Sequence, residues 1–206
     1  KYMTSIDKYN MKTGDIILFD YTGGGFFGIF DSFIKYFTKS EYTHIGMVLK
    51  DPTFLNTKLN GTYLWESSYN GTKDPQDGKV KFGVQITPLS DLINKYKGNI
   101  YLRRVHCNND YFNDERLKDI HDIVYEKPYD ILPTDWIEGI MRKDNEPQKT
   151  NRFWCSALVG YIYTSCGILK QDTDWSILRP SDFSIEGQDL KLSANIKLDD
   201  KIIKIN

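Results

Sequence analysis

The amino-acid sequence predicts an α+β fold in which helices cover an antiparallel β-sheet. Apolar and β-branched runs typical of strands gather in residues 14–107, and the two clearest helical patterns come after them. The order is a strand, a helix, a run of strands, then helices and a final strand, a segregation that favours α+β. With 206 residues, 40% of them hydrophobic, and no internal repeat or low-complexity linker, one domain over residues 1–206 is expected.

The first half of the chain is expected to supply most of the sheet. Strands are expected at 14–21, 43–51, 61–71 and 99–107, and a strand running into a short helix capped near Ser90 at 82–96. A helix is expected at 27–40, because its large apolar residues are spaced by three and four. The Gly-rich stretch before it, "YTGGGFFG", lacks the Lys-Ser/Thr pair that follows a phosphate-binding loop, so it is interpreted as a flexible connection.

The second half is expected to be mainly helical. One helix begins at an Asn113–Asp114 cap and an acidic first turn and runs to about residue 127, with a buried stripe of Leu117, Ile120 and Val124. A second helix begins at Cys155, after a poorly patterned segment. The tail, residues 194–206, is expected to form one or two edge strands around a turn.

Charge and cysteine content exclude several functional classes. Lys and Arg number 27 against 28 Asp and Glu, so the net charge of −1, without a basic stripe, gives no basis for binding nucleic acid. No apolar run approaches 18 residues, so no integral membrane segment is expected. The polar opening residues and three cysteines predict neither a secretory signal nor a disulfide framework. We expect a reducing, intracellular compartment, cytoplasmic or, for a viral protein, virion-associated; the oligomeric state is not indicated.

The segment "NRFWCSALVGYIYTSCG", residues 151–167, places a cysteine in the first turn of a helix. Its inward-facing residues at helical spacing are Cys155, Leu158, Val159, Ile162 and Cys166. A helix N-terminus favours a thiolate and offers N–H groups to an oxyanion. Cys166, roughly 16 Å further along the helix, is expected to fill the core. A lone cysteine at such a position is more often a small buried hydrophobe than a nucleophile, so a catalytic role requires a base.

Only three histidines could supply that base. His121 lies off the buried stripe of its helix and is interpreted as an ordinary surface residue. His106 stands next to Cys107, but zinc needs four ligands and no second Cys/His pair is present, so no metal site is predicted. His44 opens "HIGMVL", whose two faces are both apolar, as in a central strand. A histidine there is either a satisfied core residue or a functional one.

Hairpin geometry offers a partner for His44. If the strands flanking loop 51–60 pair as an antiparallel hairpin, paired residue numbers sum to roughly 111, which places His44 opposite Glu66 or Ser67. A sum of 110 pairs it with Glu66, with Cβ atoms about 5 Å apart, whereas a slip of one residue separates them onto opposite faces. Glu66 follows three apolar or aromatic residues, where burying an unpaired carboxylate is costly. These arguments predict a triad of Cys155, His44 and Glu66, with Glu66 as a solvated strand-end residue as the alternative.

Six motifs then suggest a family. They are, in chain order, "GDIILF", "YTHIGMVL", "LWESS", "EKPYD", "FWCSALVGYIY" and "RPSDF". Together they resemble the permuted papain-like group of NlpC-type cysteine hydrolases, which includes bacterial proteins of the YiiX type and relatives in large DNA viruses; lecithin:retinol acyltransferase is a more distant cousin. The order His, Glu, Cys is that of the permuted group. The resemblance spans roughly residues 14–184 and depends most on "HIGMV" and "CSALV".

This resemblance implies a circularly permuted papain-like fold, with an antiparallel sheet or half-barrel packed against helices that include the nucleophile helix. It implies that Cys155 is the nucleophile, His44 the general base and Glu66 the orienting third member. Tyr129 of "EKPYD", where a lysine replaces the usual glycine before the proline, is placed at the pocket wall. Trp154 is a second candidate substrate contact.

The predicted activity is cleavage of an amide bond through an acyl-enzyme, without a metal or cofactor. The substrate is a peptide, another amide or a lipid acyl group, because members of the resembled group act on all three. One alternative is a lipid acyltransferase or esterase with the same triad, for which the apolar residues 23–37 offer a contact surface. Others are a catalytically silent binding module and a structural protein. The Gly-rich loop at 22–28 is a candidate gate for the pocket.

Overall fold

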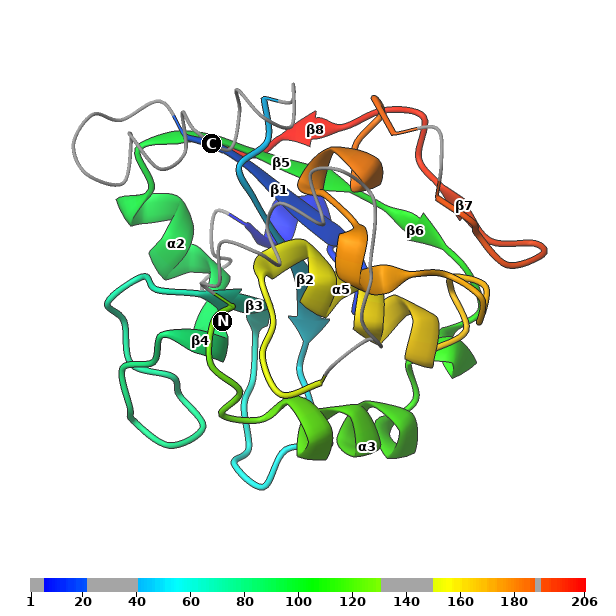
Figure 1. Cartoon of the computed structure of the whole chain (residues 1–206). Coiled ribbons are helices and arrows are strands. Elements are labelled where there is room, and N and C mark those ends of the chain that lie inside the picture. Colours follow the sequence, from blue (N-terminus) through cyan, green and yellow to red (C-terminus); the bar gives the residue numbers. More distant parts are fainter. Residues whose placement is uncertain (1–5, 22–40, 131–149, 188–189) are drawn as a thin grey trace.

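The computed structural model describes residues 6–21, 41–130, 150–187 and 190–206, and a six-stranded sheet forms its centre (Figure 1). The spatial order is β4-β3-β2-β1-β5-β8, and every neighbouring pair is antiparallel. The strand bounds are β1 Ile16–Tyr21, β2 His44–Lys50, β3 Thr62–Ser68, β4 Gly83–Pro88, β5 Gly98–Arg103 and β8 Ile203–Lys204. The predicted α+β fold with an antiparallel sheet is therefore confirmed.

Helices and a short ribbon surround this sheet. The helices are α2 Leu89–Lys95, α3 Asp114–Val124 and α5 Cys155–Ser165; the 3₁₀ turns are η1 Asp7–Tyr9, η2 Asn109–Phe112, η3 Trp175–Ile177 and η4 Pro180–Phe183. The ribbon pairs β6 (Val105–His106) with β7 (Lys197–Leu198). Within the described part of the chain, no helix is long and apolar enough to cross a membrane. The predicted helix at 27–40 and the loop at 22–28 lie outside the described residues.

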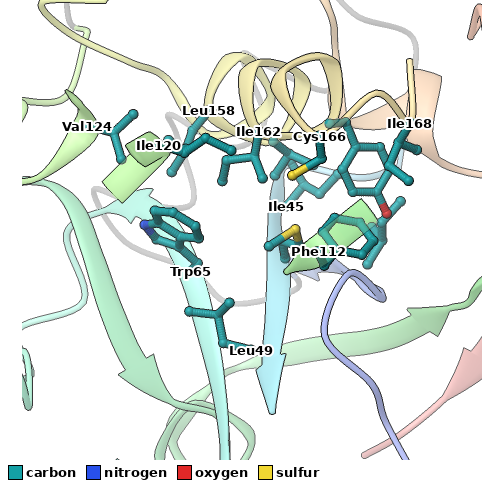
Figure 2. Packing of buried hydrophobic residues seen from close by; sticks show 14 of the residues in the cluster. Ile45, Leu49, Trp65, Phe112, Ile120, Val124, Leu158, Ile162, Cys166 and Ile168 are labelled. Carbon is teal, nitrogen blue, oxygen red and sulfur yellow. The ribbon is translucent and has the colours of Figure 1, made fainter. Parts of the chain in front are cut away.

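One face of the sheet packs against α5 and α3. The side chains that meet there are shown in Figure 2 and include Ile45 and Leu49 from β2, Trp65 from β3, Ile120 and Val124 from α3, and Leu158 and Ile162 from α5. The predicted stripe on α3 is confirmed, and the Asn113 side chain caps this helix by accepting a hydrogen bond from the Arg116 N–H.

Helix α5, which begins at Cys155, is covered on more than the one face that its periodicity predicts. Nine of its residues are buried, among them the small Ser156, Ala157 and Gly160. A Cβ at Gly160 would lie 2.8 Å from a methyl carbon of Leu178, because the segment around η3 packs closely on this side. The expectation of a single buried face was therefore wrong: α5 lies between the sheet and the η3 segment.

The opposite face of the sheet is covered by α2. Its core contains Phe19 from β1, Val48 from β2 and Leu64 from β3, which pack with Leu89 and Leu92 of α2. Since β2 has apolar side chains on both faces, it lies between β1 and β3, as predicted.

Three boundary predictions need correction or refinement. Helix α2 follows β4 directly and has Pro88 at its N-cap, so the predicted cap near Ser90 was wrong. The strand expected at 99–107 is interrupted at Arg104, whose guanidinium instead binds the backbone carbonyls of η1 and its C-cap. The tail does form two short strands, but β7 and β8 pair with different partners.

Candidate active site

The hairpin of β2 and β3 has a different register from the one that pairs His44 directly with Glu66. Residues pair as Met47 with Trp65 and Val48 with Leu64, so paired numbers sum to 112. The expected sum of roughly 111 is therefore exceeded by one, and the sum of 110 that would pair His44 directly with Glu66 differs from the observed sum by two. Because the difference is even, His44 and Glu66 remain on the same face, as diagonal rather than directly opposed neighbours.

The physical reason lies in the closure of the loop. The Asp51 N–H donates to the Gly61 carbonyl at 2.8 Å, and the Gly61 N–H donates to Oδ1 of Asp51 at 2.6 Å. Both residues have positive φ, 45° and 116°, respectively. The loop therefore closes one residue further along the chain than its turn-rich composition suggests, and this moves the whole of β3 relative to β2.

The candidate site occupies the end of the sheet where β2 and β3 separate. Their ladder ends at Met47 and Trp65, whereas β2 continues to pair with β1 as far as His44, and β3 with β4 as far as Ser68. His44 reaches across this gap, and its Nε2 lies 2.6 Å from Oε2 of Glu66. The Cys155 thiol, at the first residue of α5, lies close enough to the same imidazole to raise its pKa. The structure thus brings the three predicted triad residues together.

Electrostatics favour a protonated imidazole at this position. Burial by itself would lower the pKa of His44, but the hydrogen bonds with Cys155 and Glu66, together with their charges, raise it to about 10. Because Nε2 is engaged by Glu66, Nδ1 is the ring nitrogen left to exchange a proton with the thiol. The arrangement can therefore present an imidazolium beside the Cys155 thiol.

Glu66 is held by two further side chains that the sequence reasoning missed. Only 1% of this glutamate is exposed, and its Oε1 accepts hydrogen bonds from Asn70 Nδ2 at 2.8 Å and Thr87 Oγ1 at 2.7 Å. Asn70 Nδ2 also lies 2.9 Å from Thr87 Oγ1. A buried carboxylate with all these partners is fixed in orientation. The alternative of a solvated strand-end residue is therefore wrong. The sequence of β4 could have indicated such partners, because its polar residues Gln85 and Thr87 lie on the same face of the sheet as Glu66.

The neighbouring residue on β3 positions the start of α5. Ser67 Oγ donates a 2.6 Å hydrogen bond to the carbonyl of Phe153, two residues before the cysteine. Trp154 is the N-cap of α5 and has no side-chain oxygen to accept from the first turn. The first-turn N–H groups beside Cys155 thus have no side-chain cap in the described structure, and such groups can receive an anion.

A cavity of ≈ 430 Å³ borders His44 and Glu66 on the face covered by α2. Phe19 and Tyr96 supply much of its wall, with their ring centroids 5.0 Å apart and nearly perpendicular. Lys95, at the end of α2, also lines it. The site is therefore accessible to a small organic group next to the histidine.

The two predicted substrate contacts lie at different places. Tyr129 stacks on Phe82, with ring centroids 5.3 Å apart and an interplanar angle of 6°, and it is not among the described residues that line the cavity. Its backbone forms a parallel bridge with Phe153, so it does lie near the start of α5. Trp154 is half-buried, and its indole N–H has no partner within the described residues.

The remaining histidines and cysteines lie apart from the triad. His121 is half-buried beside Trp65 and binds Gln76 at 2.6 Å, so its interpretation as a surface residue was wrong: the loop between β3 and β4 folds against α3. His106 is exposed and binds Asp199. Cys166 is 1% exposed, and burial raises the pKa of its thiol to about 12, which agrees with its expected place in the core.

Comparison with known proteins identifies a similar fold. No family model matches the chain, and no curated protein matches it. Among solved structures, it is similar to one described as the metalloprotein yiiX (DUF1105) from Escherichia coli O157:H7, with 18% identity and a TM-score of 0.50 over 91% of this chain and 96% of that one. The likeness supports a YiiX-like fold. The word metalloprotein describes that protein; among the residues described for this chain, no group of three or more His, Cys, Asp or Glu could hold a metal ion.

Proposed function

We propose that this chain is a thiol hydrolase of the permuted papain-like, NlpC-type group, and that it cleaves an amide bond through Cys155, His44 and Glu66. The observation that carries the proposal is the His44 imidazole, hydrogen-bonded to the buried Glu66 carboxylate and adjacent to the Cys155 thiol, which raises its pKa. Three separate segments contribute one residue each, in the arrangement of nucleophile, base and orienting acid that covalent catalysis requires.

In the proposed reaction, the Cys155 thiolate attacks the carbonyl carbon and forms a C–S bond, and the oxyanion is received by backbone N–H groups at the start of α5. As the C–N bond breaks, the His44 imidazolium gives its proton to the leaving amine. The neutral imidazole then takes a proton from water, whose oxygen attacks the thioester. Breaking the C–S bond releases the acid and restores the thiolate and the imidazolium.

The environment of His44 supports its role as the acid. A pKa raised to about 10 keeps the imidazole protonated, which supplies a proton for the leaving group. The Glu66 carboxylate fixes the ring orientation, since its second oxygen is held by Asn70 and Thr87. An esterase or acyltransferase would use the same residues, so the bond that is cleaved must be determined by experiment.

The first test is the selectivity of thiol alkylation. Iodoacetamide at pH 6 is expected to modify Cys155 before Cys107 and Cys166, because a neighbouring imidazolium favours the reactive thiolate and burial raises the pKa of the other two thiols. Peptide mapping by mass spectrometry measures the three rates in one sample. His44→Ala should slow the reaction at Cys155 at least about tenfold, and His121→Ala serves as the matched histidine control.

The second test concerns the bond. Peptide-amide and lipid-ester probes are offered to the wild-type protein and to Cys155→Ala, and the adduct mass identifies the transferred acyl group. Acylation of Cys155 by amide probes supports the proposal, whereas acylation by esters alone supports the esterase. A Cys155 that reacts with iodoacetamide as slowly as Cys166 at pH 6 would refute a hydrolase of either kind.

A further inference from the structure

Asn70, the second residue after β3, links the carboxylate of the candidate triad to the loop that follows the strand. Its side-chain amide donates to Oε1 of Glu66 at 2.8 Å, and the same nitrogen lies 2.9 Å from Oγ1 of Thr87. Asn70 and Glu66 both border the cavity of ≈ 430 Å³, whereas Thr87 is not among its described lining residues. Asn70 therefore holds the carboxylate on the side where water could otherwise take its place.

The orientation of the Asn70 amide follows from its partner on the other side. Its Oδ1 accepts the backbone N–H of Thr72 at 2.9 Å and a further hydrogen bond from the Thr72 hydroxyl. Because a backbone N–H can only donate, the amide oxygen must face Thr72 and the amide nitrogen must face Glu66. The turn passes through Gly71, whose φ of 70° suits a residue without a Cβ. The loop thus fixes which end of the amide meets the carboxylate.

Each hydrogen of this cluster has a defined partner. Thr87 has one hydroxyl hydrogen, which it donates to Oε1 of Glu66 at 2.7 Å, so it must accept from Asn70. The amide of Asn70 has two hydrogens, one for Glu66 and one for Thr87. Oε1 of Glu66 consequently receives two donors, and Oε2 is left for Nε2 of His44. This division of the two oxygens holds the carboxylate in the orientation that meets the imidazole.

We propose that Asn70 is a positioning residue of the hydrolase: by donating to Glu66 from a fixed turn, it holds this carboxylate against the His44 imidazole. The inference rests on the proposed function and adds a fourth residue to the site. The competing explanation is that Asn70 serves only the turn, in which its Oδ1 accepts from the Thr72 N–H. Aspartate forms such turns as asparagine does, but an ionised aspartate has no hydrogen to donate.

Asn70→Asp separates these explanations, because it keeps the turn and removes the two donated hydrogens. The measured quantity is the rate of iodoacetamide alkylation at Cys155, divided by the wild-type rate at the same pH. At about pH 8 the introduced carboxylate repels Glu66 and loosens its hold on His44, so this relative rate should fall at least about tenfold, the factor of one charge-assisted hydrogen bond. Towards about pH 5 the two adjacent carboxylates are expected to share a proton, which restores a donor to Glu66 and the relative rate with it.

Two further variants complete the test. Asn70→Ala lacks the donor at every pH, so its relative rate should be reduced and should not recover at low pH. Asn60→Asp introduces the same charge at an exposed position in the loop between β2 and β3 and should react as the wild type does throughout. The imidazole N–H resonance of His44, observed by NMR, reports the contact with Glu66 directly. It should change in both Asn70 variants at the higher pH and return towards the wild-type position at the lower pH in Asn70→Asp alone.

The outcomes separate this positioning role from the hydrolase itself. An Asn70→Asp variant that reacts like the wild type at both pH values would leave Asn70 as a turn residue and overturn the inference, while selective alkylation of Cys155 would still support the hydrolase. A relative rate lowered equally at both pH values would also overturn the inference, because the lost donor would not be the cause. A wild-type Cys155 as slow as Cys166 at pH 6 would overturn both proposals.

Discussion

Replacing Glu66 by glutamine tests whether this carboxylate sets the protonation state of His44. In Glu66→Gln the side chain keeps its shape but loses its charge. Because Asn70 and Thr87 both donate to Oε1, the glutamine carbonyl is expected to take that position and its amino group to face His44 Nε2. An amino group there cannot accept from a protonated Nε2, so the neutral ring with its proton on Nδ1 becomes more favourable than in the wild type.

The size of the effect follows from the bond that is lost. The contact between Nε2 of His44 and Oε2 of Glu66, at 2.6 Å, is a charge-assisted hydrogen bond with a buried partner. Such bonds contribute about 1.5–3 kcal/mol, and one pKa unit corresponds to about 1.36 kcal/mol. We therefore expect the pKa of His44 to fall by about 1–2 units from its raised value of about 10.

The assay is an NMR titration of protein with ¹³C-labelled histidine, in which only three imidazole signals need assignment. Thr87→Val is the matched control, because it removes a donor from Oε1 but leaves the carboxylate against the ring; the pKa of His44 should not fall in it. If His44 titrates identically in the wild-type protein and a folded Glu66→Gln variant, the orienting and charging role of Glu66 is contradicted.

Three further predictions concern stability, measured by urea unfolding. The pKa of His44 is raised from 6.5 to about 10, so protonation of this residue favours the folded state. The free energy of unfolding of the wild type, relative to that of His44→Gln, should therefore be greatest below about pH 6.5 and decline as the pH rises through about 10. A difference that grows with pH would contradict the raised pKa. Ser67→Ala should lower the free energy of unfolding by about 1 kcal/mol, because the Phe153 carbonyl loses its 2.6 Å hydrogen bond. The same variant should also slow the alkylation of Cys155. Unchanged alkylation would argue against a positioning role for Ser67. Gly46→Ala should lower the free energy of unfolding by about 1–3 kcal/mol, because the added Cβ would lie 2.6 Å from Cγ of Leu64. If this clash is the cause, adding Leu64→Val to the Gly46→Ala variant should recover part of the lost stability.

Sequence periodicity predicted the elements well where a residue's neighbours along the chain determine its environment. The two apolar faces of β2 placed it in the interior of the sheet, and Leu117, Ile120 and Val124 form the buried stripe of α3. Burial on several sides of α5 was missed, because the covering segment around η3, although it follows α5 closely in sequence, carries no periodic pattern that links it to the helix.

The partners of the buried carboxylate were missed for a related reason. Asn70 and Thr87 meet Glu66 only because β3 and β4 pair in one register and the chain turns back after β3. Single-sequence reasoning identified the charge that needed compensation but not the groups that provide it. His121 was misinterpreted similarly, since Gln76, from a loop 45 residues away, covers it.

The observed register differs by two residues from direct pairing of His44 with Glu66, and this even shift, which keeps both side chains on one face, shows how the site depends on β3. Consecutive residues of a strand point to opposite faces, so Glu66 turns towards His44 while Ser67 turns towards Phe153 and the start of α5. One dipeptide therefore sets both the orientation of His44 and the position of the segment that leads into Cys155. A shift of two residues preserves this division of faces, whereas a shift of one exchanges it and separates His44 from Glu66. The fixed closure between Asp51 and Gly61 thus specifies the relative placement of His44 and Cys155, although neither loop residue touches the described triad.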